Sequence, residues 1–338
     1  MSRALERIMS TEPLTEDEAK QLVIAMMEGQ LNNEEMAGIL SVLQYRGETV
    51  DELVGFAKGM QEKGRKISLP YDVLDTCGTG GDGKGTFNIS TAVAILLSSL
   101  GVKVAKHGNR SVSSTTGSAD VLTALGVPFQ ETEQEVSRML QKHHLAFLFA
   151  PIYHSAMKNV APVRKQLGMK TIFNLLGPLT NPADAPCRII GVYDHVVAKK
   201  MAYASQRLGI KRALFVCGED GLDELTIQGK SYIIEVNGDH IHEFIVTPED
   251  VGLKTEAIDK ALVSSPAESA ALIKKLFAKK GAQAAENLLL LNAGAALYVQ
   301  GRAVTIKDGV KEAKEALGTH VLNHLAALQS EREEVTTL

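Results

Sequence analysis

The chain has 338 residues, 45% hydrophobic and 22% charged, which is typical of globular proteins and leaves room for two domains. Its 36 Lys and Arg against 40 Asp and Glu give a formal charge of −4, which argues against indiscriminate nucleic-acid binding. The three cysteines, Cys77, Cys187 and Cys217, show no CxxC spacing and indicate neither a disulfide framework nor a zinc site. The amino terminus lacks the apolar stretch of a secretory signal, and no apolar run is long enough for a bilayer, so we expect a cytoplasmic protein without a membrane partner.

The first seventy residues predict helices without an intervening strand. Thr15 and Glu18 have capping-box spacing before AKQLVIAMMEG, whose apolar residues recur at helical spacing. The segments LNNEEMAGILSVLQYRG and TVDELVGFAKGMQEKG continue the pattern, and each ends at or near Gly. We therefore expect a small helical bundle of three or four helices.

From Leu69–Pro70 onward the pattern changes to strands that alternate with helices. Short apolar runs at 73–78, 102–108, 145–151, 188–194 and 212–218 read as strands, and two more follow at 231–239 and 242–246. Helical patterns at 90–101 and 117–126 lie between the first of them. This alternation predicts an α/β domain with a mostly parallel central sheet flanked by helices.

Two further regions predict helix. Residues 161–182 read as helix with polar turns, and the pattern leaves open whether they join the sheet domain or the amino-terminal bundle. The last third predicts helices at 266–281, 283–301 and 308–329.

The stretch DTCGTGGDGKGTFNIST, residues 75–91, reads as strand, glycine-rich loop and helix start. Gly78, Gly80 and Gly83 satisfy the GxGxxG pattern, and Lys84 nearly completes a P-loop, but Gly85 stands where the metal-binding hydroxyl should be. In a parallel sheet such a loop lies at the carboxyl edge, where glycines and helix amides favour an anion. The alternative is a tight turn with an N-cap.

The neighbouring sequence decides against both familiar phosphate motifs. A dinucleotide fold requires an acid at the end of the second strand, where this chain has Lys106 and His107. That strand continues into KHGNRSVSS, residues 106–114, which is rich in cationic, hydroxyl and amide groups. Because adjacent parallel strands bring their loops side by side, the two loops favour a small sugar with phosphate at both ends.

GTGGD, NIST, KHGNRSVSS, GSAD, NLLGPLTNP and DGLDE, in this order, resemble the anthranilate phosphoribosyltransferase family over nearly the whole chain. That family belongs to the type III phosphoribosyltransferases and shares its fold with pyrimidine nucleoside phosphorylases. The resemblance implies a helical domain of residues 1–69 with a returning segment near 163–187, which forms a homodimer. It also implies an α/β domain of residues 70–162 and 188–338.

The resemblance implies a pentosyltransferase of tryptophan biosynthesis. It would move the phosphoribosyl group of 5-phosphoribosyl 1-diphosphate to the amine of anthranilate and release diphosphate. The sugar site would be lined by Gly78, Gly81, Asp82, Thr86, Asn88, Ile89, Ser90, Thr91, Lys106, His107, Gly108, Asn109, Arg110, Ser111, Val112, Ser113, Ser114 and Ser118. Anthranilate would contact Gly78, Asn109 and Arg164. Two Mg²⁺ per subunit would be held with Ser90, Asp223 and Glu224.

Residue chemistry is consistent with these roles. Asp223 and Glu224 follow a predicted strand and so leave the same sheet edge as the glycine loop, although an acidic loop alone is ordinarily solvated surface. Asp82, a carboxylate among phosphates, is expected to bond a loop amide or metal-bound water. Arg164 has the planar fork that matches a carboxylate; the alternative is a surface arginine.

Three side chains near the motifs need no chemical role. The amine of anthranilate is already neutral and nucleophilic at pH 7, so His107 and His154 could simply shape the pocket rather than act as bases. No covalent nucleophile is required, and we expect Cys77 to be buried packing.

Two rival functions share the fold. In the nucleoside phosphorylases the phosphate loop reads KHSTGGVGD, unlike DTCGTGGDG followed by KHGNR. A non-catalytic relative that binds nucleic acid would need a strong basic groove and would have no use for Asp223 and Glu224. We therefore expect small-molecule substrates and no nucleic-acid partner.

Overall fold

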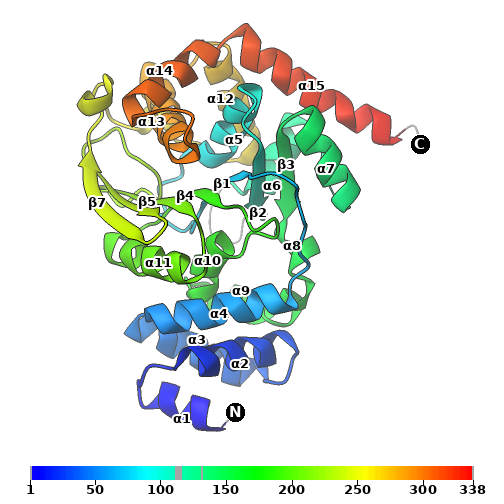
Figure 1. The fold of residues 1–338 in the computed structure, drawn as a ribbon, viewed down its shortest axis with the longest axis vertical. Helices are drawn as coiled ribbons and strands as arrows, with labels where there is room; N and C mark the ends of the chain where they lie inside the picture. Colours follow the sequence, from blue (N-terminus) through cyan, green and yellow to red (C-terminus); the bar gives the residue numbers. More distant parts are fainter. Residues whose placement is uncertain (1, 111–115, 131, 337–338) are drawn as a thin grey trace.

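A bundle of helices at the amino terminus lies against an α/β domain built on one seven-stranded sheet in the computed structural model (Figure 1). The structure describes residues 2–110, 116–130 and 132–336. The predicted fold class, a helical bundle plus a mostly parallel α/β domain, is confirmed. Among the described helices, none is both long and apolar enough to cross a membrane.

The bundle helices start where local capping signals place them. They are α1 (Ser2–Met9), α2 (Glu16–Met27), α3 (Asn33–Arg46) and α4 (Val50–Lys63). The Thr15 side chain accepts a hydrogen bond from the Glu18 amide, and the Glu18 side chain accepts one from the Thr15 amide, as the capping-box spacing predicted. α3 and α4 begin with the same reciprocal arrangement.

The segment whose location the sequence left open lies on the bundle. It forms the helices α9 (Ala161–Leu167) and α10 (Ile172–Leu176), and a 3₁₀ turn, η1 (Ser155–Asn159), precedes it. η1 packs on α2, α9 packs on α3, and α10 packs on α3 and α4. The exact limits of the two domains stay a prediction.

The sheet reverses its direction of winding next to its first strand. The strands are β1 (Leu74–Gly78), β2 (Val104–Gly108), β3 (Leu145–Phe149), β4 (Cys187–Gly191), β5 (Arg212–Gly218), β6 (Ser231–Asn237) and β7 (His240–Val246). Their order is β3-β2-β1-β4-β5-β6-β7, parallel from β3 to β5 and antiparallel from β5 to β7. The chain adds β2 and β3 on one side of β1, and it then returns to add β4 and β5 on the other side of β1. Ligands of open α/β sheets bind at such a reversal, outside the carboxyl ends of the strands.

Helices cover both faces of the sheet. α5 (Ile89–Ser99) and α13 (Gln283–Gln300) pack on one face, and α11 (His195–Arg207) packs on the other, between the sheet and the bundle (Figure 1). The remaining helices and turns are α6 (Ser118–Leu125), α7 (Glu133–Lys142), α8 (Ala150–Tyr153), η2 (Gly177–Leu179), η3 (Glu249–Val251), η4 (Asp259–Ala261), α12 (Pro266–Phe277), α14 (Ile306–Ala316) and α15 (Thr319–Thr336). The single helix expected at 308–329 is wrong: the chain breaks at Gly318, whose φ of 100° is in the left-handed region.

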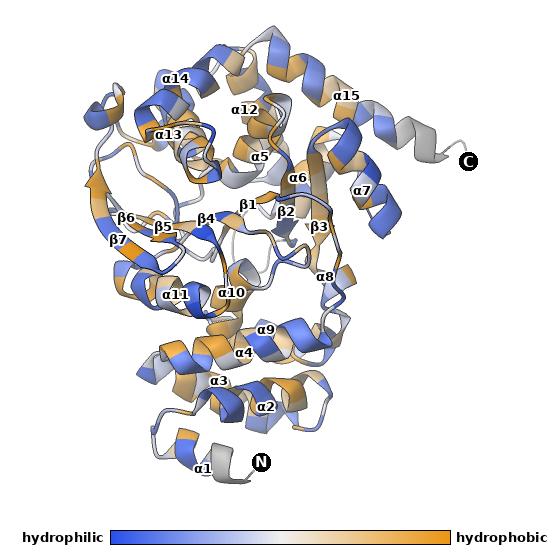
Figure 2. Ribbon diagram, in the orientation of Figure 1, coloured by the Kyte–Doolittle hydropathy of each residue, from blue (hydrophilic) through white to orange (hydrophobic). Residues whose placement is uncertain are grey.

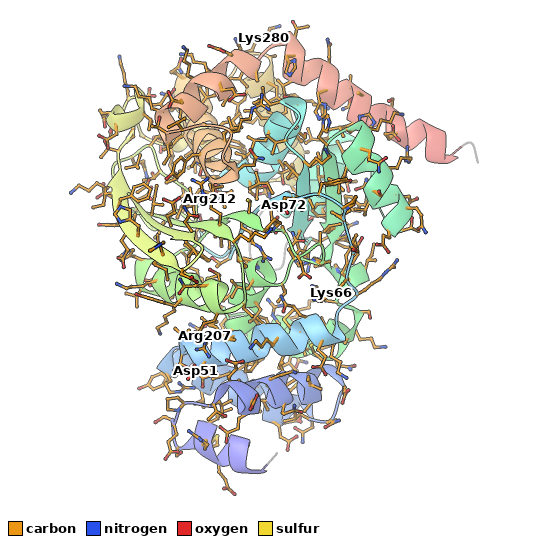
Figure 3. The ribbon with its side chains drawn as sticks, in the orientation of Figure 1. Asp51, Lys66, Asp72, Arg207, Arg212 and Lys280 are labelled. Carbon is orange, nitrogen blue, oxygen red and sulfur yellow. The ribbon has the colours of Figure 1, made fainter. Side chains whose placement is uncertain are left out.

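Two apolar cores meet at the sheet. Leu214 and Val216 of β5 face the core under α5 and α13, whereas Ala213 and Phe215 face the second core. That second core continues through α10 and α11 into the bundle, and hydrophobic residues line this path (Figure 2). At its rim, Arg207 of α11 pairs with Asp51 of the bundle (Figure 3). The bundle and the sheet therefore share one core.

Candidate active site

Four neighbouring parallel strands, β2, β1, β4 and β5, end in glycine, and the loop after β5 lies against the ends of the last three. A Cβ on Gly191, the last residue of β4, would lie 1.6 Å from the carbonyl oxygen of Asp223. A Cβ on Gly78 would lie 3.1 Å from the Asp223 carboxylate, and one on Gly218 would lie 2.4 Å from the Asp220 carboxylate. The absent side chains let the acidic loop approach the strand ends closely.

Hydrogen bonds join the acidic loop to the glycine loop. Asp223 Oδ2 accepts from the Gly80 amide at 2.8 Å, and the Asp223 amide donates to Asp82 Oδ2 at 3.4 Å. Asp82 Oδ1 also accepts from the Lys84 amide at 3.1 Å, which is the loop-amide role expected for this carboxylate. The two loops predicted to share the carboxyl edge of the sheet are thus in direct contact.

The acids at this edge are electrostatically strained. Burial, and next the neighbouring Asp82, raise the pKa of Asp223 to about 7. Burial, and next the neighbouring Asp223, raise the pKa of Glu224 well above its ordinary value, while Lys106 and a hydrogen bond from the Ser90 amide oppose the shift. A cation bound here would relieve this repulsion.

The oxygen donors fit Mg²⁺ that is held only in part by protein. Asp82, Asp223, Glu224 and the Ser90 hydroxyl offer hard oxygen atoms, which Mg²⁺ prefers. Within the described part of the chain, no group of three or more His, Cys, Asp or Glu could hold a metal ion by itself. This incomplete set suits a metal whose other ligands are water and substrate phosphates.

The glycine loop bends through conformations that side chains disfavour. Positive φ angles of 65°, 76°, 70° and 71° occur at Gly80, Gly81, Gly83 and Gly85. The loop leads into α5, where the Asn88 side chain caps the helix by accepting from the Thr91 amide at 3.0 Å. An open glycine backbone followed by a helix amino terminus is suited to an anion.

Strand alternation sends Lys106 and His107 of β2 to opposite faces. Lys106 is buried, and its Nζ donates to the carbonyl of Thr76 and, at 3.0 Å, to Ser90 Oγ. Burial lowers the pKa of Lys106, and Asp75 and Glu224 oppose that shift. The ammonium therefore lies at the start of α5, beside the hydroxyl predicted to bind metal.

The two histidines lie together on the other face. Burial lowers the pKa of His107 to about 4 and that of His154 to about 3, so both rings are neutral at pH 7. His107 Nδ1 donates to the Gly177 carbonyl at 3.1 Å, and His154 Nε2 donates to the Thr180 carbonyl at 3.2 Å. The ring centroids are 5.3 Å apart. Packing and backbone hydrogen bonds account for both residues better than proton transfer does.

The loop after β2 lies beside α6. A Cβ on Gly108 would lie 3.2 Å from the Ser118 Cβ, and the Asn109 carbonyl accepts from the Ala119 amide at 3.2 Å. Arg110 pairs with Asp120 at 2.7 Å. The predicted residues Ser111, Val112, Ser113 and Ser114 lie outside the described residues.

Three other predicted residues, Thr86, Ile89 and Thr91, lie at or near the start of α5. The Thr86 carbonyl accepts from Thr116 Oγ1 at 3.3 Å, which ties the two predicted phosphate loops together. The side chains of Ile89 and Thr91 are buried, so only their backbone would face a ligand at the loop.

Arg164 is a half-buried cation without an ion-pair partner among the described residues. Its Nη2 donates to Asn174 Oδ1 at 3.4 Å, and its guanidinium lies 5.5 Å from the ring centroid of Phe173. Asn174 Nδ2 in turn donates to the Thr79 carbonyl at 3.5 Å, next to Gly78. Burial lowers the pKa of Arg164, with no acid nearby to oppose it. The arginine is thus placed near the glycine loop, and no carboxylate of the described residues pairs with it.

Sequence reasoning missed Lys170, which the turn between α9 and α10 brings to the glycine loop. Its ammonium lies 3.4 Å from the ring centroid of Tyr193, and a Cβ on Gly81 would lie 3.0 Å from its Cε. No local motif marks Lys170, because its position depends on how the returning segment packs. Sequence reasoning also missed Asp75, whose side chain is fully buried. Its carboxylate accepts hydrogen bonds from Asn181 Nδ2 at 2.7 Å and from the His107 amide at 3.1 Å.

Comparisons with known proteins agree with this architecture. Residues 2–64 match the model described as glycosyl transferase family, helical bundle domain, and residues 70–320 match the model described as glycosyl transferase family, a/b domain. An anthranilate phosphoribosyltransferase of Halalkalibacterium halodurans is 49% identical over 98% of this chain and 97% of its own. The crystal structure of an anthranilate phosphoribosyltransferase from Thermus thermophilus is 38% identical, with a TM-score of 0.88 over 98% of this chain and 99% of that chain.

A more distant enzyme has the same fold with substrate bound. The anthranilate phosphoribosyltransferase from Saccharomyces cerevisiae, in complex with PRPP and Mg, is 26% identical, with a TM-score of 0.88 over 98% of this chain and 97% of that chain. Both domains and nearly the full length thus match. The chain belongs to this glycosyl transferase family and, within it, to the anthranilate phosphoribosyltransferases.

Proposed function

We propose that the protein transfers the phosphoribosyl group of 5-phosphoribosyl 1-diphosphate (PRPP) to the amine of anthranilate, giving N-(5-phosphoribosyl)anthranilate and diphosphate. The observation that carries this proposal is the contact between the glycine loop and the acidic loop, made by the Gly80 amide and the Asp223 carboxylate. This contact supports the proposal because a loop suited to an anion and a loop suited to a cation meet at the switch point of the sheet.

PRPP would lie along the carboxyl ends of β1 and β2. The glycine loop and the first turn of α5 present backbone amides to phosphate, and Lys106 adds a point charge beside Ser90. The remaining predicted sugar-site residues, from Gly108 to Ser118, would line the other end of the substrate. The hydrogen bond from Thr116 Oγ1 to the Thr86 carbonyl supports this arrangement.

Mg²⁺ would be held by Asp223, Glu224 and Ser90, and we propose two ions per subunit. When bound, Mg²⁺ neutralises the charge that grows on the departing diphosphate. The chain's part is to hold the acids in place: the Gly80 amide fixes the Asp223 carboxylate, and the Ser90 amide bonds Glu224. The two acids thus stay at the end of the substrate where charge develops.

Anthranilate would bind through its carboxylate to Arg164, with Asn109 and the Gly78 backbone completing the site. An unpaired, partly desolvated guanidinium binds a carboxylate more strongly than an exposed one does. Asn174 holds both Arg164 and the Thr79 carbonyl, so it fixes the arginine relative to the loop on which the sugar sits. The neutral histidines are consistent with attack by an amine that needs no base.

We further propose that the protein is a cytoplasmic homodimer of the tryptophan pathway that associates through its helical bundle. Two large apolar side chains of the bundle, Met9 and Tyr45, are 68% and 89% exposed, which supports an interface there. Light scattering after size exclusion measures the mass, and a monomer would contradict the dimer.

The direct test is to mix the protein with anthranilate, PRPP and Mg²⁺ and to follow the loss of anthranilate fluorescence. We expect turnover that needs both substrates and stops when divalent ions are removed. Asp223→Asn provides the matched inactive variant. Phosphorolysis of thymidine by the same protein, without loss of anthranilate fluorescence, would favour the phosphorylase instead. Salt-dependent DNA binding with neither activity would favour the nucleic-acid-binding relative.

A further inference from the structure

A cation of the chain lies beside the carboxylates that would hold Mg²⁺. Lys170 is half-buried, and its side chain crosses the glycine loop so closely that a Cβ on Gly81 would lie 3.0 Å from its Cε. Its ammonium lies over the ring of Tyr193, 3.4 Å from the centroid. Tyr193 follows β4 in the chain, next to the strand ends that carry the acidic loop. The lysine is therefore held between the glycine loop and the end of β4.

Three acids attract this ammonium electrostatically. Asp223, Asp82 and Asp194 attract it and oppose the effect of burial on its pKa, in that order of size. Among the described residues, Lys170 makes no ion pair within 4.0 Å, so the attraction acts through space and the Tyr193 ring supplies the direct contact. The ammonium can thus balance the carboxylate charge without blocking the carboxylate oxygens.

The segment that carries Lys170 also carries a second cation of the site, Arg164. Arg164 lies six residues before Lys170, in α9, and Asn174 follows Lys170 in α10 and bonds both Arg164 and Thr79. The position of Lys170 over Gly81 is therefore fixed by the packing that places the acceptor arginine.

We propose that Lys170 is a built-in counter-cation of the carboxylates, which makes the site select magnesium that arrives with the sugar diphosphate over free magnesium. A free divalent ion would be repelled by the ammonium. The same ammonium would attract the diphosphate, so the metal and the substrate bind more strongly together than the metal does alone. Lys170 is a specificity-determining residue in this role, which rests on the proposed metal site.

The test measures metal binding without catalysis. Mn²⁺ is titrated into the substrate-free, full-length protein, and the free ion is counted by electron paramagnetic resonance. We expect Lys170→Met to bind Mn²⁺ at least about threefold more tightly than the wild type does, because a nearby like charge is gone. Lys170→Arg keeps the charge and should bind Mn²⁺ within about twofold of the wild type. With saturating PRPP present, the advantage of Lys170→Met should shrink or reverse.

A matched control separates this effect from net charge. Lys165 lies on the same segment but is exposed, so Lys165→Met removes one positive charge away from the glycine loop. Equal gains in Mn²⁺ affinity from Lys165→Met and Lys170→Met would overturn the proposal. So would unchanged or weaker Mn²⁺ binding by a folded Lys170→Met variant, including binding too weak to detect, or a gain shared by Lys170→Arg. An inactive wild type would instead overturn the proposed function, which this titration does not use.

Discussion

Gly191→Ala is expected to damage the active site from beneath the acidic loop. The added Cβ would lie 1.6 Å from the Asp223 carbonyl oxygen, so that oxygen must retreat by about 1.4 Å to reach the 3.0 Å below which real Cβ contacts are essentially never found. Gly191 does not have a positive φ, so the contact alone is responsible. The displaced backbone carries the carboxylate that bonds the Gly80 amide.

A displacement of about 1 Å at a catalytic group costs about 100-fold in rate. We therefore expect kcat/KM for PRPP to fall at least about 100-fold, with a higher Mg²⁺ requirement, at a stability cost of about 1–3 kcal/mol. The assay is the loss of anthranilate fluorescence at varied Mg²⁺, with circular dichroism and Tm as fold controls.

Gly38→Ala is the matched control for this experiment. No atom lies within 4 Å of a Cβ at Gly38 in α3, so this variant should keep full activity and gain about 0.5–1 kcal/mol of stability. A folded Gly191→Ala protein with the kinetics and Mg²⁺ dependence of the wild type would refute the reasoning.

The other predictions concern the acceptor site, pH and the histidines. Arg164→Ala should raise the KM for anthranilate about 10- to 100-fold and the KM for PRPP far less. Lys165→Ala, at an exposed position on the same segment, is the control, and equal rises in KM for both substrates would contradict the role of the arginine. Because the pKa of Asp223 is about 7, its carboxylate is protonated below that pH, and metal binding should weaken about tenfold from pH 8 to pH 6. Mn²⁺ titration at both pH values measures this change, and equal affinities would contradict the prediction. His107→Ala should keep kcat within about tenfold, since loss of a general base costs about 100-fold or more; inactivation of a protein with an unchanged Tm would show that the ring takes part in the reaction.

Signals that act within a few residues predicted the fold well. The capping box at Thr15 and Glu18 forms as the spacing required, and the alternation of strands and helices gave the parallel sheet. The helix α7 was not predicted, although Thr132 and Glu135 at its start have the same capping-box spacing. The break at Gly318 was missed because helical patterns continue on both sides of it.

The candidate site was predictable only where a motif is continuous in the chain. The glycine loop and the loop after β2 each follow a strand, so their meeting follows from parallel pairing alone. Lys170 and Gly191 carry no local signal. The position of Lys170 depends on how the returning segment packs, and the need for glycine at 191 comes from a loop more than thirty residues later that lies across the end of β4. Asp75 reads as an ordinary strand residue until Asn181, far along the chain, is seen to bond it.

The core shared by the bundle and the sheet couples the integrity of the active site to that of the whole molecule. Since Phe215 of β5 and the inner residues of α4 belong to the same apolar cluster, heat or denaturant should melt both domains in one transition rather than in two. A bundle cut free of the sheet would expose that surface to water and would tend to aggregate. A core substitution anywhere along this interior should therefore lower the amount of folded protein rather than change the kinetics of the candidate active site.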